Sequence, residues 1–378
     1  PELAGGPVDD GSPYAAQPIF PRPAGQLTTT AADLATCARF LMSDGTMDGR
    51  PLVDSRLMEA RGQPQATEAA SAGLVAGYGL GLGRRDPHGV VGYCHGGNIV
   101  GFVAMLCISP GAQKAFAYSV NTDSETADYG RIERLMIKAI EIAPAAPPAT
   151  DPSTDISAWH GRYVLSPNRF RAFEYLDTVF GSVRIAAEGD ELVMTSLQHQ
   201  ARRLRPVGNR RYSASDRTAA SHVFFESDTG DYLMSDGFQT YRKTTLAFLL
   251  AHWVSATLGV AGIVWLALAG VMSVVRYRTR VVGQPVAPAF AAIVLLCLPV
   301  PFFFTQSFMA LGDFTLASGL LAAVTLLLPM GILLALVRAT KAWTSERDGL
   351  LTGVAAVLAL QWCIALMAAG MIPFRLWA

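Results

Sequence analysis

The residues of this chain best suited to chemistry lie in one short run, Tyr93-Cys94-His95-Gly96-Gly97-Asn98, which Gly101-Phe102 follows. Histidine exchanges a proton near neutral pH, so the run is a candidate for acid–base or hydrogen-bonding chemistry. The alternative is a structural strand histidine beside a glycine turn. No C-x-x-C pair or Cys/His cluster occurs among the five cysteines, so we expect no metal site.

The run resembles the third active-site motif of the serine β-lactamase and penicillin-binding-protein superfamily, where His-x-Gly often replaces Lys-Thr-Gly in the esterase-like branch. Two further stretches add to this resemblance. Pro23 to Ala35 is similar to a Pro-Ala-Gly-x-Leu-x-Thr-Thr-Ala segment of the family, and Tyr78-Gly79-Leu80-Gly81 is similar to a run that begins a strand. The resemblance covers about residues 20–143 and implies an α/β fold with helices packed on a partial antiparallel sheet.

In that family a serine attacks a carbonyl carbon and forms an acyl-enzyme. The resemblance implies that His95 supplies a proton donor or positive potential, that Gly97 allows close approach of backbone, and that Asn98 N–H donates to the oxyanion hole. Tyr78 and Gly96 are the implied substrate-contacting residues. Gly96 replaces the family's hydroxyl residue, and histidine is a weaker permanent cation than lysine. These departures favour a small ester, amide or peptide substrate over a β-lactam.

The partners of this motif in the family, a Ser-x-x-Lys nucleophile and a Tyr-x-Asn base, occur nowhere in the 378 residues. Both precede the Pro-Ala-Gly segment in family members, so we expect this chain to be the C-terminal part of a serine hydrolase and to be inactive alone. The alternative is a non-catalytic, membrane-tethered, penicillin-binding-like protein that binds cell-wall or partner ligands. We expect no cofactor.

Residues 1–143 form the predicted hydrolase-like region. Thr30 and Asp33 have the spacing of a helix cap, and the helix should run to about Met42 and end at Ser43-Asp44-Gly45. Strands are predicted at Val90–Cys94, Phe102–Ser109 and Lys114–Val120, and a helix at about Asp128–Ile142. Its sheet-facing stripe should comprise Tyr129, Ile132, Leu135, Met136, Ala139 and Ile140.

Cys94 and Cys107 flank the predicted turn between two of these strands and could be cross-strand neighbours. We expect two buried thiols; a disulfide is the alternative if the domain is exported.

Residues 144–154 read as a stiff Pro/Ala-rich linker, and residues 155–243 as a small antiparallel barrel or sandwich, because turn signals recur there at short intervals. This part resembles the accessory β-domain of many such hydrolases. Its basic residues suggest either a solvated loop face or contact with anionic cell-wall polymer or lipid headgroups; they are Arg202, Arg203, Arg205, Arg210 and Arg211. The scattered His88, His160, His199 and His222 read as turn or surface residues.

Four uncharged apolar segments, residues 246–275, 286–311, 314–337 and 349–372, are long enough to cross a bilayer as helices. Pro299, Pro301 and Pro329 should kink two of them. Transport usually requires ionisable residues inside the membrane, and these segments contain none at mid-depth, so we expect no transport function. The net charge of zero gives no field that would attract nucleic acid.

Orientation follows from the basic loops. Arg276, Arg278 and Arg280 follow the first segment, and Arg338, Lys341 and Arg347 follow the third. The positive-inside rule places these loops in the cytoplasm of a bacterial cell, and residues 1–245 on the periplasmic or extracellular side.

Overall fold

The computed structural model describes residues 6–7, 13–14, 28–64, 67–99, 101–122, 124, 126–146, 148–151, 157–168, 173–197, 200–306, 310–342 and 347–377. The contacts divide the chain into two units. The first comprises residues 1–17, 21–167 and 182–244, and the second comprises residues 18–20, 168–181 and 245–378. Residues 23–27 of the Pro23–Ala35 segment, and His199, lie outside the described residues.

The first unit contains a five-stranded antiparallel sheet with strand order β5-β6-β7-β8-β9. The strands are β5 Gly77–Tyr78, β6 Gly83–Arg85, β7 Gly92–Ile99, β8 Phe102–Ser109 and β9 Lys114–Val120. The predicted bounds of β8 and β9 are confirmed. The strand expected at Val90–Cys94 instead begins at Gly92 and continues to Ile99, so the His-Gly-Gly-Asn run lies within a strand and not in a loop.

Helix α1, Ala31–Met42, covers one face of this sheet. Thr30 caps it by accepting a hydrogen bond from Asp33 N, as the spacing predicts. Ala38 packs on the fully buried Ile108 of β8. Small flanking elements complete this region: β1 Gly6–Pro7, β2 Pro13–Tyr14, β3 Thr46–Met47, β4 Arg50–Pro51, α2 Ser55–Ala60 and α3 Glu68–Ser71.

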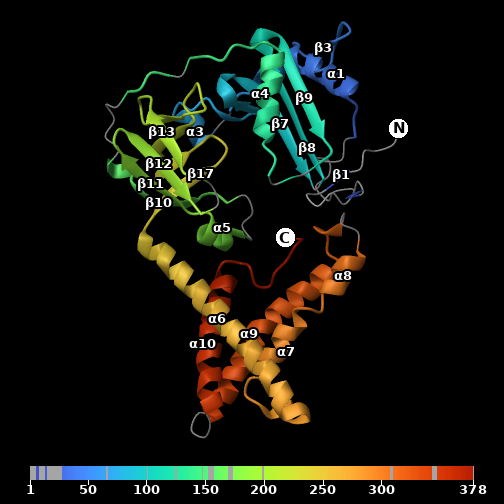
Figure 1. Cartoon of the computed structure of the whole chain (residues 1–378), viewed down its shortest axis with the longest axis vertical. Helices are drawn as coiled ribbons and strands as arrows, with labels where there is room; N and C mark the ends of the chain where they lie inside the picture. The colour runs from blue at the N-terminus through green and yellow to red at the C-terminus, as the bar shows by residue number, and fades with distance from the viewer. Residues whose placement is uncertain are drawn as a thin grey trace. The chain divides into compact units, whose positions relative to one another are not determined.

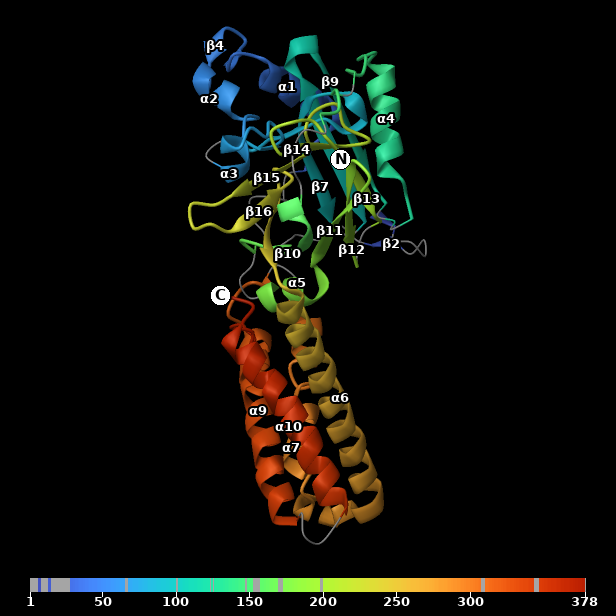
Figure 2. The ribbon, with the colours of Figure 1, turned by 90° about the vertical axis from the view of Figure 1, so that its left-hand side faces the viewer.

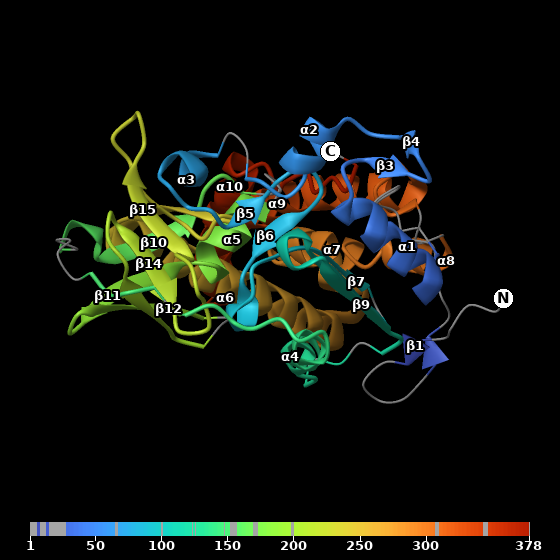
Figure 3. The same ribbon diagram turned by 90° about the horizontal axis from the view of Figure 1, so that it is seen from above.

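Helix α4, Tyr129–Ala139, covers the opposite face, and Figures 1 and 3 show the sheet between α1 and α4. The predicted sheet-facing stripe was partly wrong, because Leu135 is 58% exposed and Ala139 is exposed. Glu133 is buried instead. The Glu133 carboxylate accepts a hydrogen bond from the hydroxyl of Tyr118 on β9, so α4 turns Glu133 toward the sheet where the pattern predicts Leu135. Burial and Glu133 raise the pKa of Tyr118 to about 12.

The rest of the first unit is a closed eight-stranded antiparallel barrel, which confirms the prediction of a small all-β barrel-like domain. Its strands are β10 Gly161–Leu165, β11 Val183–Glu188, β12 Glu191–Ser196, β13 Arg202–Pro206, β14 Arg211–Ala214, β15 His222–Glu226, β16 Tyr232–Ser235 and β17 Thr240–Thr244. Tyr163, Tyr212 and Phe224 fill its core with aromatic rings. Four of these basic residues lie on strands, so the expectation of a loop face was wrong for them: Arg202, Arg203 and Arg205 on β13 and Arg211 on β14.

Of the histidines expected in turns or on the surface, His88 lies in a turn and His222 does not lie at the surface. His222 is 1% exposed, and its Nδ1 forms a 2.9 Å hydrogen bond with Ser221 Oγ. The turn-or-surface interpretation of this residue was therefore wrong. His88 lies in the turn Pro87–Gly89, in agreement with the prediction, and is half-buried beside Glu133, with Nε2 3.7 Å from a carboxylate oxygen. Burial lowers the pKa of His88 despite this neighbour.

The second unit is a bundle of apolar helices, shown side-on in Figure 2. The helices are α6 Leu246–Tyr277, α7 Ala287–Leu295, α8 Val300–Thr305, α9 Leu316–Ala342 and α10 Arg347–Ala368. By length and composition four segments could cross a membrane, with α7 and α8 forming one of them. The helix breaks between α7 and α8, next to Pro299 and Pro301, as predicted, whereas α9 continues through Pro329.

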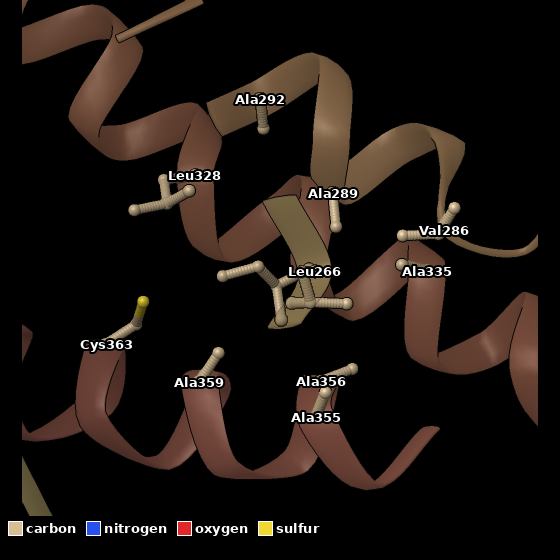
Figure 4. Packing of buried hydrophobic residues seen from close by; sticks show 11 residues of the cluster. Leu266, Val286, Ala289, Ala292, Leu328, Ala335, Ala355, Ala356, Ala359 and Cys363 are labelled. Carbon is tan, nitrogen blue, oxygen red and sulfur yellow. The ribbon is translucent and has the colours of Figure 1, made fainter. Parts of the chain in front are cut away.

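Small residues bring the helices of this bundle close together. Figure 4 shows Leu266 of α6 among Ala289 of α7, Ala335 of α9 and Ala356 of α10. A side chain at Gly262 would lie 2.6 Å from the carbonyl oxygen of Ala355, so only glycine permits this contact. Close backbone approach of this kind is typical of helices that associate in a bilayer.

A short helix that the sequence did not predict belongs to this unit. Helix α5, Glu174–Phe180, lies in the connection between β10 and β11 and packs on α6 and α10. Trp253 donates to the carbonyl of Val179 at 2.8 Å, and Trp362 donates to the Tyr175 hydroxyl at 3.1 Å.

Candidate active site

The candidate site is the exposed second half of strand β7. His95, Gly96, Gly97 and Asn98 are all exposed, and each lies opposite a residue of β8. On its other side β7 pairs with β6, but that pairing ends where Gly83 lies opposite Cys94. Beyond Cys94, no described strand therefore pairs with β7 on the β6 side.

A disulfide joins β7 to β8 directly before this open edge. Cys94 and Cys107 lie opposite each other, their Cα atoms are 4.2 Å apart, and their sulfurs are bonded. The expectation of two free thiols was wrong, because the strand register superposes two side chains that the sequence separates by 13 positions.

The distance between these two Cα atoms also indicates the direction of the backbone groups. In antiparallel sheets the closer pairs are those that do not exchange hydrogen bonds with each other, so Cys94 directs its N–H and C=O away from β8. Consistently, a Cβ built on Gly83 of β6 would lie 3.6 Å from the Cys94 carbonyl oxygen. Strand geometry repeats every two residues, so Gly96 and Asn98 direct their N–H groups to the open edge, whereas Gly97 directs its N–H to β8.

The two glycines have different surroundings. A side chain at Gly97 would meet nothing within 4 Å, whereas one at Gly96 would lie 3.0 Å from the terminal carbon of Met105. The space beside Gly97 is on the same side of the sheet as His95, since residues two apart share a face.

Two aromatic rings adjoin His95. The ring of Tyr78, at the end of β5, lies 6.5 Å from the imidazole at 75°. The ring of Phe238 lies 5.4 Å from that of Tyr78 at 85°, the edge-to-face arrangement that aromatic pairs favour. Tyr78 is 50% exposed and Phe238 is 42% exposed.

Phe238 comes from the barrel, on the turn between β16 and β17. Asp236 Oδ1 accepts hydrogen bonds from the N–H groups of Phe238 at 2.9 Å and Gln239 at 2.7 Å, which holds the turn. Gly237, at φ +85°, lies so close to the sheet that a Cβ would be 2.3 Å from the Ala76 carbonyl oxygen. Ser235-Asp236-Gly237 is one of the turn signals that recur in residues 155–243, but nothing in the sequence indicates that the next residue reaches Tyr78.

The barrel is fastened to the sheet at a second point. Asp86, which follows β6 and is 4% exposed, accepts 2.8 Å hydrogen bonds from the N–H groups of Thr218 and Ala219. Its other oxygen lies 3.3 Å from a guanidinium nitrogen of Arg217.

Among the residues that the sequence predicts for the site, the structure brings together His95, Tyr78 and the glycines, and it adds Phe238.

Comparison with known proteins supports the first part of this description. Residues 1–140 match the family model described as Beta-lactamase. No curated protein matches the chain.

Among solved structures, the chain is similar to "Crystal structure of SurE with D-Leu", at 19% identity and a TM-score of 0.34, over 57% of this chain and 50% of that one. It is similar to "Crystal structure of SurE" at 18% identity and a TM-score of 0.33, over 57% of this chain and 48% of that one. The chain therefore spans about half the length of these structures, and at such TM-scores the likeness carries no conclusion.

Proposed function

Residues 1–140 belong to a β-lactamase-related serine hydrolase family, and from that premise we propose that the chain is the C-terminal part of an exported, membrane-anchored acyl-enzyme hydrolase. Its substrates are small esters, amides or peptides. The observation that carries the proposal is the open edge of β7, where the N–H of Asn98 points away from β8 next to the exposed His95.

The proposed chemistry is acyl transfer to a serine. The serine oxygen bonds to the substrate carbonyl carbon, the carbonyl oxygen becomes an oxyanion, and the leaving group departs with a proton; water then releases the acyl group. Asn98 N–H donates to the oxyanion, and such a donor contributes about 2.7–4 kcal/mol to the transition state in a comparable hydrolase.

The side chains next to Asn98 have distinct proposed roles. His95 donates a proton or a hydrogen bond to the substrate, and the free space beside Gly97, on the same face of the sheet, admits the substrate. Gly96 offers no hydroxyl for a substrate carboxylate, which favours neutral esters and amides over β-lactams. Tyr78 contacts the substrate beside His95.

No Ser-x-x-Lys motif occurs in the 378 residues, and the proposal therefore assigns the activity to a longer protein that contains one. The test is labelling of that protein with a serine-directed acylating probe, together with hydrolysis of a small acetyl ester. We expect labelling of the longer protein and none of residues 1–378 alone. An unlabelled longer protein that hydrolyses no ester would overturn the proposal and favour the non-catalytic binding role.

For location, we propose a bacterial cell membrane with residues 1–245 on its outer side. The basic loops after the first and third spans support this, and so does the Cys94–Cys107 disulfide, because disulfides persist in oxidising compartments. The test is maleimide labelling of intact cells in a Cys37→Ser background. Cysteine placed at Asp190 should react with an impermeant reagent, and cysteine placed at Arg276 should not. The reverse pattern would contradict the assignment.

A further inference from the structure

The turn between β16 and β17 brings an aromatic ring of the barrel to the edge of the candidate active site. Phe238 stacks edge-to-face on Tyr78 at 5.4 Å, and Tyr78 in turn lies 6.5 Å from the imidazole of His95. These rings belong to segments that 160 positions of sequence separate, yet both segments lie within the first unit.

The contact is built to hold a defined position. Gly77, at φ +143°, would place a Cβ 2.8 Å from the Gly237 carbonyl oxygen, and Gly237 approaches Ala76 still more closely. Side chains at either position would separate the turn from the strand. The Asp236 carboxylate fixes the turn from within through its bonds to Phe238 N and Gln239 N. The position of the Phe238 ring is therefore determined by backbone contacts on both sides.

Packing within the protein covers only part of each of the two rings. The edge of Phe238 contacts β6, where a Cβ on Gly83 would lie 3.0 Å from its Cε1 atom. Even so, Phe238 is 42% exposed and Tyr78 is 50% exposed. Rigid aromatic rings that are held in place but only half covered offer contact area to an apolar group at little entropic cost.

Resting on the proposed function, we propose that Phe238 and Tyr78 form a subsite for a flat, apolar substituent next to the scissile carbonyl, so that the barrel sets substrate selectivity. The preferred substrates then carry an aromatic ring on the acyl or the leaving side. The barrel takes no part in bond making or breaking, and His95 and Asn98 keep the roles proposed above.

The test uses the longer protein that contains the nucleophile, with two matched substrate pairs. Acetyl and phenylacetyl esters of one alcohol vary the acyl side, and ethyl and benzyl acetate vary the leaving side. We expect kcat/KM to favour the phenyl member of one pair, and Phe238→Ala to reduce that ratio roughly threefold to tenfold, the range of one aromatic contact. Phe238→Tyr should retain the kcat/KM ratio of the unmodified protein, because it keeps the aromatic ring.

The matched control is Leu197→Ala, which removes an exposed apolar side chain that follows barrel strand β12 and should leave the ratio unchanged. Amide exchange in β16 and β17 reports whether the Phe238→Ala barrel stays folded. If esters are hydrolysed but Phe238→Ala leaves both ratios unchanged with the barrel intact, the subsite is overturned while the hydrolase proposal stands. If no ester is hydrolysed by the unmodified protein, the proposed function fails, and the subsite fails with it.

Discussion

The carboxylate of Asp86 accepts a 2.8 Å hydrogen bond from the backbone N–H of Thr218, a residue 132 positions further along the chain. This bond and its neighbours from Ala219 N and Arg217 join the end of β6 to the barrel loop between β14 and β15. The position of Phe238 beside Tyr78 also requires the barrel to be held against the sheet. The buried carboxylate of Asp86 therefore helps to position the candidate site, although Asp86 is not part of it.

Replacing Asp86 should therefore loosen the first unit. Asp86→Ala leaves two backbone donors and the Arg217 guanidinium without their partner, and removal of one member of a buried ion pair costs about 3–5 kcal/mol. Hydrogen exchange of the Thr218 and Ala219 amides should accelerate accordingly. Asp190→Ala, in the exposed turn between β11 and β12, is the control and should change the free energy of unfolding by less than about 0.5 kcal/mol. Unchanged exchange at Thr218 and Ala219 would contradict this account of the joint.

The disulfide predicts a simple count of reactive thiols. Unfolded in denaturant without a reductant, the chain should take up three alkyl groups, at Cys37, Cys297 and Cys363, and after reduction it should take up five. Mass spectrometry measures both numbers. Five groups without a reductant, in protein isolated with its thiols protected from exchange, would show that Cys94 and Cys107 are not bonded.

The same disulfide should stabilise the sheet. The Cys94→Ser/Cys107→Ser double variant should lose about 3 kcal/mol of unfolding free energy, the value for a closed loop of about this length. Unfolding in urea, monitored through amide exchange in β7 and β8, measures this loss of free energy. Cys37→Ser, at an exposed and unbonded position, is the control.

Proline scanning tests the direction of the backbone N–H groups on β7. Asn98→Pro removes an N–H that points to the open edge, where proline is tolerated, so stability should change by less than about 1 kcal/mol. Gly97→Pro removes an N–H directed to β8 and should cost about 1–3 kcal/mol. Thermal unfolding of the two variants compares them. Equal losses, or the larger loss at Asn98, would mean that Asn98 N–H bonds β8 and cannot serve an oxyanion.

The pair of prolines also separates folding from function. In the longer protein, Asn98→Pro should reduce kcat about 100- to 1000-fold if its N–H stabilises the oxyanion. Asn98→Ala keeps the N–H and should retain most activity.

Stability of the barrel should depend on pH through His222. Burial, with Arg202 and Arg217 nearby, lowers the pKa of His222 to about 3, below the ordinary value of 6.5. The unfolded chain therefore binds more protons between these values, so the contribution is complete above about pH 6.5 and decreases as the pH falls toward 3.

Between pH 7.5 and pH 5 the barrel should lose about 2 kcal/mol through this residue. His222→Gln should remove that part of the pH dependence, whereas His160→Gln, which keeps His222, should not. Urea unfolding at the two pH values, followed by amide exchange in β14 and β15, measures the difference. An unchanged pH dependence in the His222→Gln variant would show that the residue does not titrate on unfolding.

The sequence alone determined the features whose signals are contiguous along the chain. Thr30 and Asp33 predict the start of α1, alternation and turn residues predict β8, β9 and the barrel, and long uncharged runs predict four membrane-spanning segments. Each of these rests on local capping, periodicity or hydropathy, which neighbouring residues express by themselves.

Only the tertiary structure decided how distant segments meet. The bond between Cys94 and Cys107, the burial of Glu133 in place of Leu135, the direction of Asn98 N–H and the reach of Phe238 to Tyr78 all depend on strand register and on packing between elements. A shift of register by one residue would reverse every one of the strand contacts without altering any local signal. For that reason the residue types of the candidate site can be identified from the sequence, while its geometry is determined only by the tertiary structure.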